Sequence, residues 1–204
     1  MHLVRAGAQP FQEWCQMRSD LTFGHAEYAA LRQTIASRGT VRMIIVPLTL
    51  LGWVATSIVL VLLSPLPLPT VLPLAVLAAG FEAVYALHIG VERIGRYLQV
   101  FYEETAADDF VIAPRWETTA MAAVPSVPGG GIDPLFSILF GLATVVNLVT
   151  AFLPDATGFE LTMVSALHLT FLARIIRARA AARGQRARDL AHFRALKTNG
   201  VQSS

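Results

Sequence analysis

Long uncharged stretches alternate with strongly charged ones along this chain. Residues 43–81 contain no Asp, Glu, Lys, Arg or His, and residues 134–154 contain none either. An α-helix rises about 1.5 Å per residue, so about twenty apolar residues are needed to cross the roughly 30 Å hydrocarbon core of a bilayer. The first stretch is long enough for one crossing and part of a second, and the other stretch is long enough for one more.

Prolines mark where the predicted crossings begin and end. Residues 64–70 read Ser-Pro-Leu-Pro-Leu-Pro-Thr, and these alternating prolines disfavour helix, so a tight turn is predicted there. Asp133 followed by Pro134 is typical of a helix start. The last apolar segment is short, with thirteen residues from Leu161 before Arg174. The crossings are predicted over residues 41–63, 71–98, 133–153 and 161–178.

The basic residues decide the number and direction of the crossings. Of the sixteen Lys and Arg residues, five lie up to residue 42, three lie from 93 to 115, and eight lie from Arg174 onward. Cytoplasmic segments are enriched in Lys and Arg, and only four crossings put all sixteen on one side. We predict a multi-pass protein of the inner membrane, with both termini and the loop 99–132 in the cytoplasm.

The segments that flank the crossings have different characters. Residues 1–24 lack periodicity and are expected to form a poorly structured extension, without the apolar core of a signal peptide. Residues 25–40 predict a short amphipathic cytoplasmic helix, with Tyr28, Leu31 and Ile35 on one face. We expect it to lie on headgroups, pack on other cytoplasmic parts or dock a partner, with Gly39 separating it from the first crossing.

The segment after the last crossing, residues 179–204, is a basic cytoplasmic tail that is predicted to be helical. Basic residues beside a crossing attract anionic lipid at about 1 kcal/mol each. The arginines predicted to contact lipid headgroups are Arg177, Arg179, Arg183, Arg186 and Arg188. The predicted fold class is an all-α integral membrane protein, a four-transmembrane-helix bundle with an N-terminal amphipathic helix and a basic C-terminal helical extension.

Composition narrows the class of protein further. Hydrophobic residues make up 54% of the chain and charged residues 15%, against about 25% charged in soluble domains. With a single cysteine, this composition disfavours a secreted disulfide scaffold, a disordered chain and a nucleic-acid-binding domain. Nucleotide-binding, zinc-protease, serine-hydrolase and Cys-x-x-Cys motifs are absent from the sequence. We predict no catalytic residue, no metal and no cofactor, and we expect a protein that is not an enzyme.

One polar stripe is predicted along the second crossing. At 100° per residue, its members fall within a sector of about 140°. They are Glu82, Tyr85, His88, Glu92, Arg93 and Arg96. Glu82 lies about 16 Å from the start of this helix, near the midplane of a bilayer. An ionisable group at that depth costs about 2.5–3.5 kcal/mol, so we expect the stripe to face the bundle interior, another subunit or water.

Three polar residues on the other crossings are predicted partners of this stripe. Asn147 lies on the third crossing, and His168 and Arg174 lie on the fourth. The stripe could act as a hydrogen-bonded and ion-paired seam, as a proton or ion path through Glu82, or as a metal site of Glu82 and His168. Haem is disfavoured because His88 and His168 differ by about 15 Å in height, whereas axial ligands of one iron lie about 4 Å apart.

These features predict a non-enzymatic accessory or scaffold subunit of a membrane assembly. Its expected partners are anionic lipid headgroups, other membrane subunits or further copies of itself, and not nucleic acid. The alternative is a small homo-oligomeric proton-coupled transporter or channel, in which Glu82 is the intramembrane coupling carboxylate.

Overall fold

The computed structural model describes residues 9–63, 70–104, 134–153 and 157–202, with side chains described from residue 24 onward. All regular structure in these residues is helical, and no strand occurs in them. The helices are α1 (Gln9–Leu63), α2 (Val71–Leu98), the π-helical turn η2 (Gln99–Glu103), α4 (Pro134–Thr150) and α5 (Gly158–Gln202).

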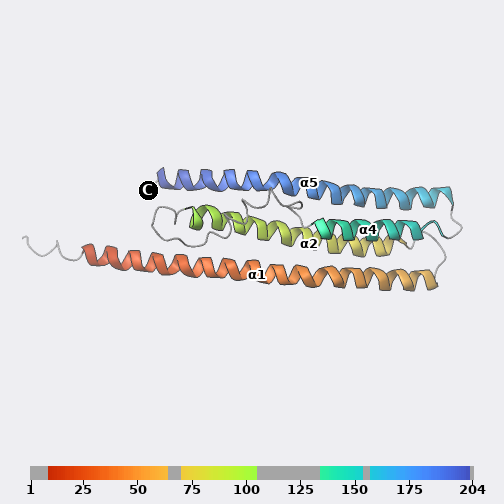
Figure 1. Cartoon of the computed structure of the whole chain (residues 1–204), viewed down its shortest axis with the longest axis horizontal. Helices are drawn as coiled ribbons and strands as arrows, with labels where there is room; N and C mark the ends of the chain where they lie inside the picture. The colour runs from red at the N-terminus through yellow and green to blue at the C-terminus, as the bar shows by residue number, and fades with distance from the viewer. Residues whose placement is uncertain (1–8, 64–69, 105–133, 154–156, 203–204) are drawn as a thin grey trace, which may run out of the picture.

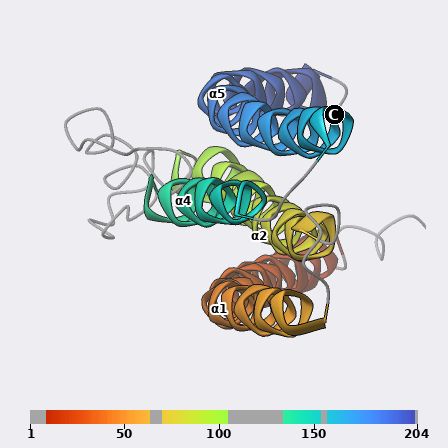
Figure 2. The ribbon, with the colours of Figure 1, turned by 90° about the vertical axis from the view of Figure 1, so that its right-hand side faces the viewer.

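The helices run alternately up and down, with α2 at the centre. The two longest helices, α1 and α5, lie on opposite sides of α2, and α4 lies beside α2 over only part of its length (Figure 1). Seen from one end, α2 separates α1 from α5 (Figure 2). α2 packs against α1, α4 and α5. The first residues of α1 and the last residues of α5 lie at one end of the bundle, here called the termini end, and the opposite end is the turn end (Figure 1).

Length and composition indicate a membrane protein. Three helical segments are long and apolar enough to cross a bilayer, namely Gly24–Leu60, Val71–Glu103 and Gly158–Asn199. α4 has 17 residues and is a shorter apolar helix. Its outward face is apolar, with Leu135, Ile138 and Leu142 each more than half exposed. Water disfavours an apolar surface of this extent, whereas lipid accommodates it.

The helix bounds differ from the predicted ones at both ends of the chain. α1 is continuous from Gln9 through Gly39 to Leu63, where the sequence predicted an unstructured extension, a separate helix and a break. A glycine inside a helix costs only about 1 kcal/mol. Contacts on its N-terminal side offset that cost, because Tyr97 and Tyr102 both donate hydrogen bonds to Glu27, at 3.1 and 2.6 Å.

The last helix also exceeds its predicted crossing. α5 runs unbroken from Gly158 to Gln202, so the crossing predicted over 161–178 and most of the tail predicted over 179–204 form one rod. Thr157 starts this helix by a capping box, in which the Glu160 backbone amide donates to the Thr157 hydroxyl at 3.3 Å and the Thr157 backbone amide donates to the Glu160 carboxylate at 3.0 Å. α4 ends at Thr150, and residues 151–153 form a turn.

An aromatic cluster forms the centre of the core. The ring of Phe81 on α2 lies edge-on to Phe140 of α4 and Phe171 of α5, with centroid distances of 5.6 and 5.8 Å. Edge-to-face rings attract one another through their quadrupoles, so this arrangement adds to the dispersion energy of close packing. Phe81 is only 2% exposed. Its ring contacts connect α2, α4 and α5 in the middle of the bundle.

A glycine lets α1 and α2 approach closely. A Cβ atom built on Gly80 would lie 2.2 Å from the Cγ2 and Oγ1 atoms of Thr49 on α1. Small residues at helix contacts are typical of membrane helix pairs, because dispersion forces grow as the backbones approach. Thr49 satisfies its own hydroxyl by donating to the Ile45 carbonyl at 2.8 Å. Gly80 therefore sets the separation of the two helices.

Replacing Gly80 with alanine is expected to destabilise the bundle, because the new Cβ would overlap Thr49 and push α1 from α2. Overpacking of this kind costs about 1–3 kcal/mol, and thermal unfolding in detergent measures the loss. Gly52→Ala is the matched control on the same helix pair, since its Cβ would lie an ordinary 3.5 Å from Val76. Equal thermal unfolding midpoints for the two variants would contradict the close approach of α1 and α2 at Gly80.

Candidate functional site

Three helices and the residue that precedes α2 meet in one hydrogen-bonded cluster near the turn end of the bundle, here called the turn-end network. It consists of Trp53 on α1, Thr70 before α2, Asn147 on α4 and His168 on α5. The indole nitrogen of Trp53 donates to Asn147 Oδ1 at 3.3 Å. The Asn147 amide nitrogen donates to the Thr70 carbonyl at 2.9 Å and lies 2.9 Å from His168 Nε2.

The geometry fixes the tautomer of the histidine in this network. His168 Nδ1 lies 2.7 Å from the Val164 carbonyl oxygen, which can only accept, so Nδ1 carries the proton. Nε2 is then an acceptor for the second Asn147 amide hydrogen. Both amide hydrogens and the carbonyl oxygen of Asn147 are thus engaged. This full satisfaction matters because Asn147 and His168 are 1% and 0% exposed.

A different arrangement surrounds the acidic residue halfway along α2. Arg174 on α5 donates to Glu82 at 2.8 Å, and its guanidinium lies 5.0 Å from the centroid of the Tyr85 ring. The pair, here called the lateral ion pair, is not interior: the side chains of Arg174 and Glu82 are 40% and 48% exposed. Of the three environments predicted for the stripe, the bundle interior is therefore excluded for Glu82. Another subunit and water remain.

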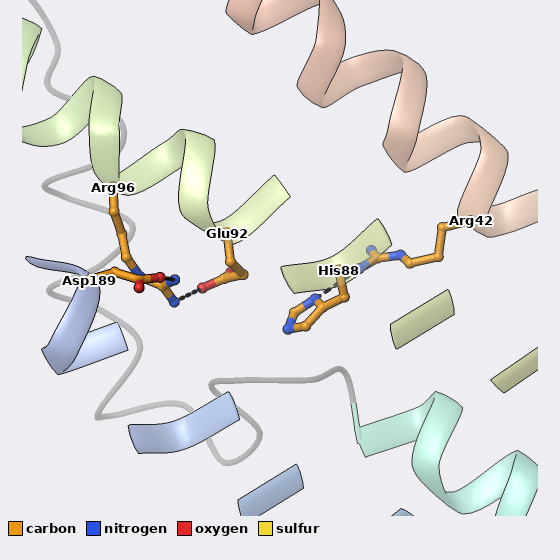
Figure 3. Close-up of polar contacts among 5 residues, drawn as sticks. All are labelled: Arg42, His88, Glu92, Arg96 and Asp189. Carbon is orange, nitrogen blue, oxygen red and sulfur yellow. Dashed lines mark hydrogen bonds and ion pairs between the residues drawn. The ribbon is translucent and has the colours of Figure 1, made fainter. Parts of the chain in front are cut away.

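Nearer the termini end, His88 turns toward α1. Its Nδ1 lies 3.3 Å from a guanidinium nitrogen of Arg42 (Figure 3). The Arg42 guanidinium also lies 5.1 Å from the centroid of the Phe136 ring on α4. His88 is 6% exposed. A cation over an aromatic face is stabilised by the ring quadrupole, so Arg42 links α1 to both α2 and α4.

An arginine near the C-terminal end of α2 links this helix to α5. Arg96 pairs with Glu92 one turn earlier and with Asp189, at 3.0 Å to the latter (Figure 3). Arg96 is 2% exposed, so this charge depends on its two carboxylates. Close by, Lys197 donates to the Val100 carbonyl at 3.0 Å, and Arg194 pairs with Glu104 at 2.8 Å on the surface.

The predicted stripe therefore divides between two neighbouring helices, α1 and α5, and the surface. Tyr85 lies beneath the lateral ion pair, His88 faces α1, Glu92 and Arg96 face α5, and Arg93 is exposed. Of the three predicted partners, Arg174 is paired with a stripe residue. Asn147 and His168 instead bind each other in the turn-end network.

The predicted lipid-contacting arginines lie on several sides of α5. Arg177 and Arg188 are exposed, whereas Arg179 and Arg186 are half-buried. The side chain of Arg183 lies outside the described residues. No group of three His, Cys, Asp or Glu residues that could hold a metal occurs in the part of the chain that is described. Glu82 and His168, the suggested metal pair, take different partners.

Sequence reasoning missed three of the residues that build these clusters. Asp189 is the only acidic residue after Arg174, which is a signal that it pairs with a buried base. Arg42 and His88 both lie near the cytoplasmic ends of their predicted crossings. Their similar heights could therefore have predicted that these two side chains meet. Trp53 carried no such signal, because its role depends on how α1 is rotated toward α4.

Comparison with known proteins identifies no relative of this chain. No family model, curated protein or solved structure matches this chain.

Asn147→Ala is expected to destabilise the protein more than a mutation that removes an exposed hydroxyl group. The reason is that Trp53, His168 and Thr70 each lose the hydrogen bond that they make with Asn147. A buried polar group left unsatisfied costs about 1–3 kcal/mol, and unfolding in detergent measures it. Thr170→Ala is the control, since Thr170 is exposed and bonds only to the Ala166 carbonyl of its own helix.

A double-mutant cycle of Asn147→Ala with His168→Ala isolates the central hydrogen bond. Contacts of this class in membranes couple by about 0.6 kcal/mol on average and up to about 1.7. Strictly additive losses would show that the two side chains do not interact.

Proposed function

We propose that this chain is a four-span membrane protein with both termini in the cytoplasm, and that it serves as a non-enzymatic subunit that holds a larger membrane assembly together. The lateral ion pair is the observation that carries this proposal. It offers a charged contact on the outer face of an otherwise apolar bundle.

The heights of the polar clusters support the four-crossing topology. Starting at the turn end, a 30 Å hydrocarbon layer spans about twenty helical residues. On α2 this layer ends near Val91, immediately before the cluster of Glu92, Arg96 and Asp189, in which Arg96 is buried. On α5 it ends near Ala178. α4 has 17 residues, about 26 Å of helix, and the adjoining turn at 151–153 adds to its reach.

The polar surfaces beyond this layer fit an aqueous compartment. The termini-end parts of α1, α2 and α5 carry an exposed ion pair between Arg194 and Glu104, and tyrosine hydroxyls bonded to Glu27. Such groups are hydrated at low cost. The abundance of arginine in this part of α5 favours the cytoplasmic side.

The depth and exposure of Glu82 together support a partner subunit. Lipid tails cannot hydrogen-bond the free carboxylate oxygen or the remaining guanidinium hydrogens, so about half of each side chain would be poorly solvated. Exposed Ala79 and Ala86 flank Glu82 on the same face of α2. Small residues around a polar pair permit the close helix contact that buries it.

Cysteine labelling tests the topology. The chain has one cysteine, Cys15, so Cys15→Ser gives a clean background. Thr157→Cys and Thr198→Cys lie at exposed positions at opposite ends of α5. A membrane-impermeant maleimide is expected to label position 157 in intact cells and position 198 only after permeabilisation. Labelling of position 198 from outside would overturn the four-crossing arrangement.

Glu82→Gln is expected to weaken the assembly, because it removes the charge that a neighbouring subunit would contact. Polar contacts in membranes contribute about 0.6–1.7 kcal/mol, which corresponds to about a 3- to 20-fold loss of association. The measurement is the mass of complexes extracted in mild detergent, with Glu104→Gln as control because it breaks a surface ion pair of the same length.

Two results would contradict the scaffold proposal. If the wild-type chain is extracted only as a monomer, it is not part of a larger assembly, which contradicts the proposal. Intact assembly combined with loss of proton-coupled transport in Glu82→Gln would favour the transporter alternative, in which the carboxylate changes protonation during transport.

A further inference from the structure

A groove runs between α4 and α5 on the side of α5 away from Glu82. Its volume is about 420 Å³, and its walls are mostly apolar, including Ile138, Leu172 and Ile176. Pockets that hold small ligands have volumes of about 300–1,000 Å³. Gly141 contributes open space to the wall, because a Cβ atom built on it would have no neighbour within 4 Å.

Two polar residues line this apolar groove, and neither has a hydrogen-bond or ion-pair partner among the described residues. Ser137 is 7% exposed, and its hydroxyl has no hydrogen-bond partner. By contrast, Thr144 on the same helix bonds to the Phe140 carbonyl four residues earlier, as helical hydroxyls commonly do. Arg179 also lines the groove, and the described residues include no carboxylate paired with it.

Both residues lie at one height, near the cytoplasmic surface of the proposed membrane layer. Counted from the contact between Asn147 and His168, Ser137 is ten residues along α4 and Arg179 is eleven along α5, or about 15–17 Å in each case. Ser137 is three residues, about 5 Å, from the first residue of α4, and Arg179 is about 8 Å nearer the termini end than Arg174, so its long side chain can reach the lipid phosphates.

The geometry points to a binding site for one anionic phospholipid in this groove. The acyl chain lies along Ile138, Gly141 and Ile176, and the phosphate is bound by Arg179. The Ser137 hydroxyl donates to a phosphate or ester oxygen of the same lipid. Guanidinium groups bind phosphate through two parallel hydrogen bonds, and basic pockets between helices at the cytoplasmic surface suit anionic headgroups. This inference depends on the membrane placement proposed above and not on the role of Glu82.

Lipid binding can be measured on the full chain in mild detergent by native mass spectrometry. Phosphatidylglycerol and phosphatidylcholine are titrated separately, and inorganic phosphate is added as a competitor. We expect one phosphatidylglycerol to remain bound at about tenfold lower concentration than phosphatidylcholine, because the choline of phosphatidylcholine offsets the negative charge of its phosphate. Equal retention of the two lipids would overturn the site.

Four variants test the individual contacts. Arg179→Gln is expected to lower phosphatidylglycerol retention to the level of phosphatidylcholine, and Ser137→Ala to lower it several-fold. Gly141→Leu should abolish retention of either lipid by filling the groove. Ala180→Leu serves the same purpose at an exposed position on the groove wall, should Gly141→Leu fail to fold.

Arg177→Gln is the matched control, because Arg177 is exposed and does not line the groove. An equal loss in Arg177→Gln and Arg179→Gln would reduce the effect to general positive charge and overturn the site. Displacement of the lipid by millimolar inorganic phosphate would identify a phosphate site in which the acyl chain plays no part, which also contradicts the proposal. Because the assay is done in detergent, it does not depend on which way the chain crosses the membrane.

Discussion

Asn147 can keep its hydrogen bonds only while four segments of the chain stay in place, and this requirement organises the bundle. The amide accepts from Trp53 on α1, donates to the carbonyl of Thr70 before α2, and donates to His168 on α5. Inside a bilayer no water could replace a lost partner. Sliding or rotation of any one helix therefore breaks a hydrogen bond in a place where it cannot be replaced. The network specifies the register that dispersion packing among apolar side chains leaves open.

The packing below this network follows from the register it sets. With the turn end fixed, Phe81 meets Phe140 and Phe171, and Gly80 meets Thr49. These contacts are shape-specific but not directional, so by themselves they would tolerate a shift more readily than hydrogen bonds do. Specific polar contacts at both ends, with close packing between them, explain how such an apolar chain adopts one arrangement.

The sequence was sufficient for the helical class, for three apolar helices, and for the end of α1 at Leu63 and the start of α2 at Val71. It was sufficient because helix length in a bilayer is dictated by thickness, and because alternating prolines exclude helix. Helix ends were harder to predict. Gly39 looked like a break, yet α1 continues through it, since a helix boundary depends on contacts such as Glu27 with Tyr97, between residues 70 positions apart.

For the candidate site too, the sequence predicted several of the residues that take part but few of the contacts that they make. Asn147 and His168 were predicted as partners of the α2 stripe, whereas the structure joins them to each other. Periodicity gave the angular range of the α2 stripe, but it could not say which neighbour each residue would meet. That depends on the relative rotation of helices, which a single chain's pattern does not encode. His88 consequently faces α1, while Arg96, eight residues further along α2, faces α5.

The two arginines that mark the proposed contacts differ in a way that bears on what each binds. Arg174 and Arg179 are five residues apart on α5, a rotation of about 140°, so they serve opposite sides of the same helix. Arg174 is paired with Glu82, whereas Arg179 beside Ser137 has no carboxylate partner among the described residues. A neutralised pair suits a protein surface at mid-depth, where an unpaired charge would be expelled. An unneutralised arginine about 8 Å nearer the cytoplasmic surface can reach the phosphate layer with its long side chain, and there the lipid supplies the opposite charge. α5 thus separates a side for protein contact from a side for lipid contact.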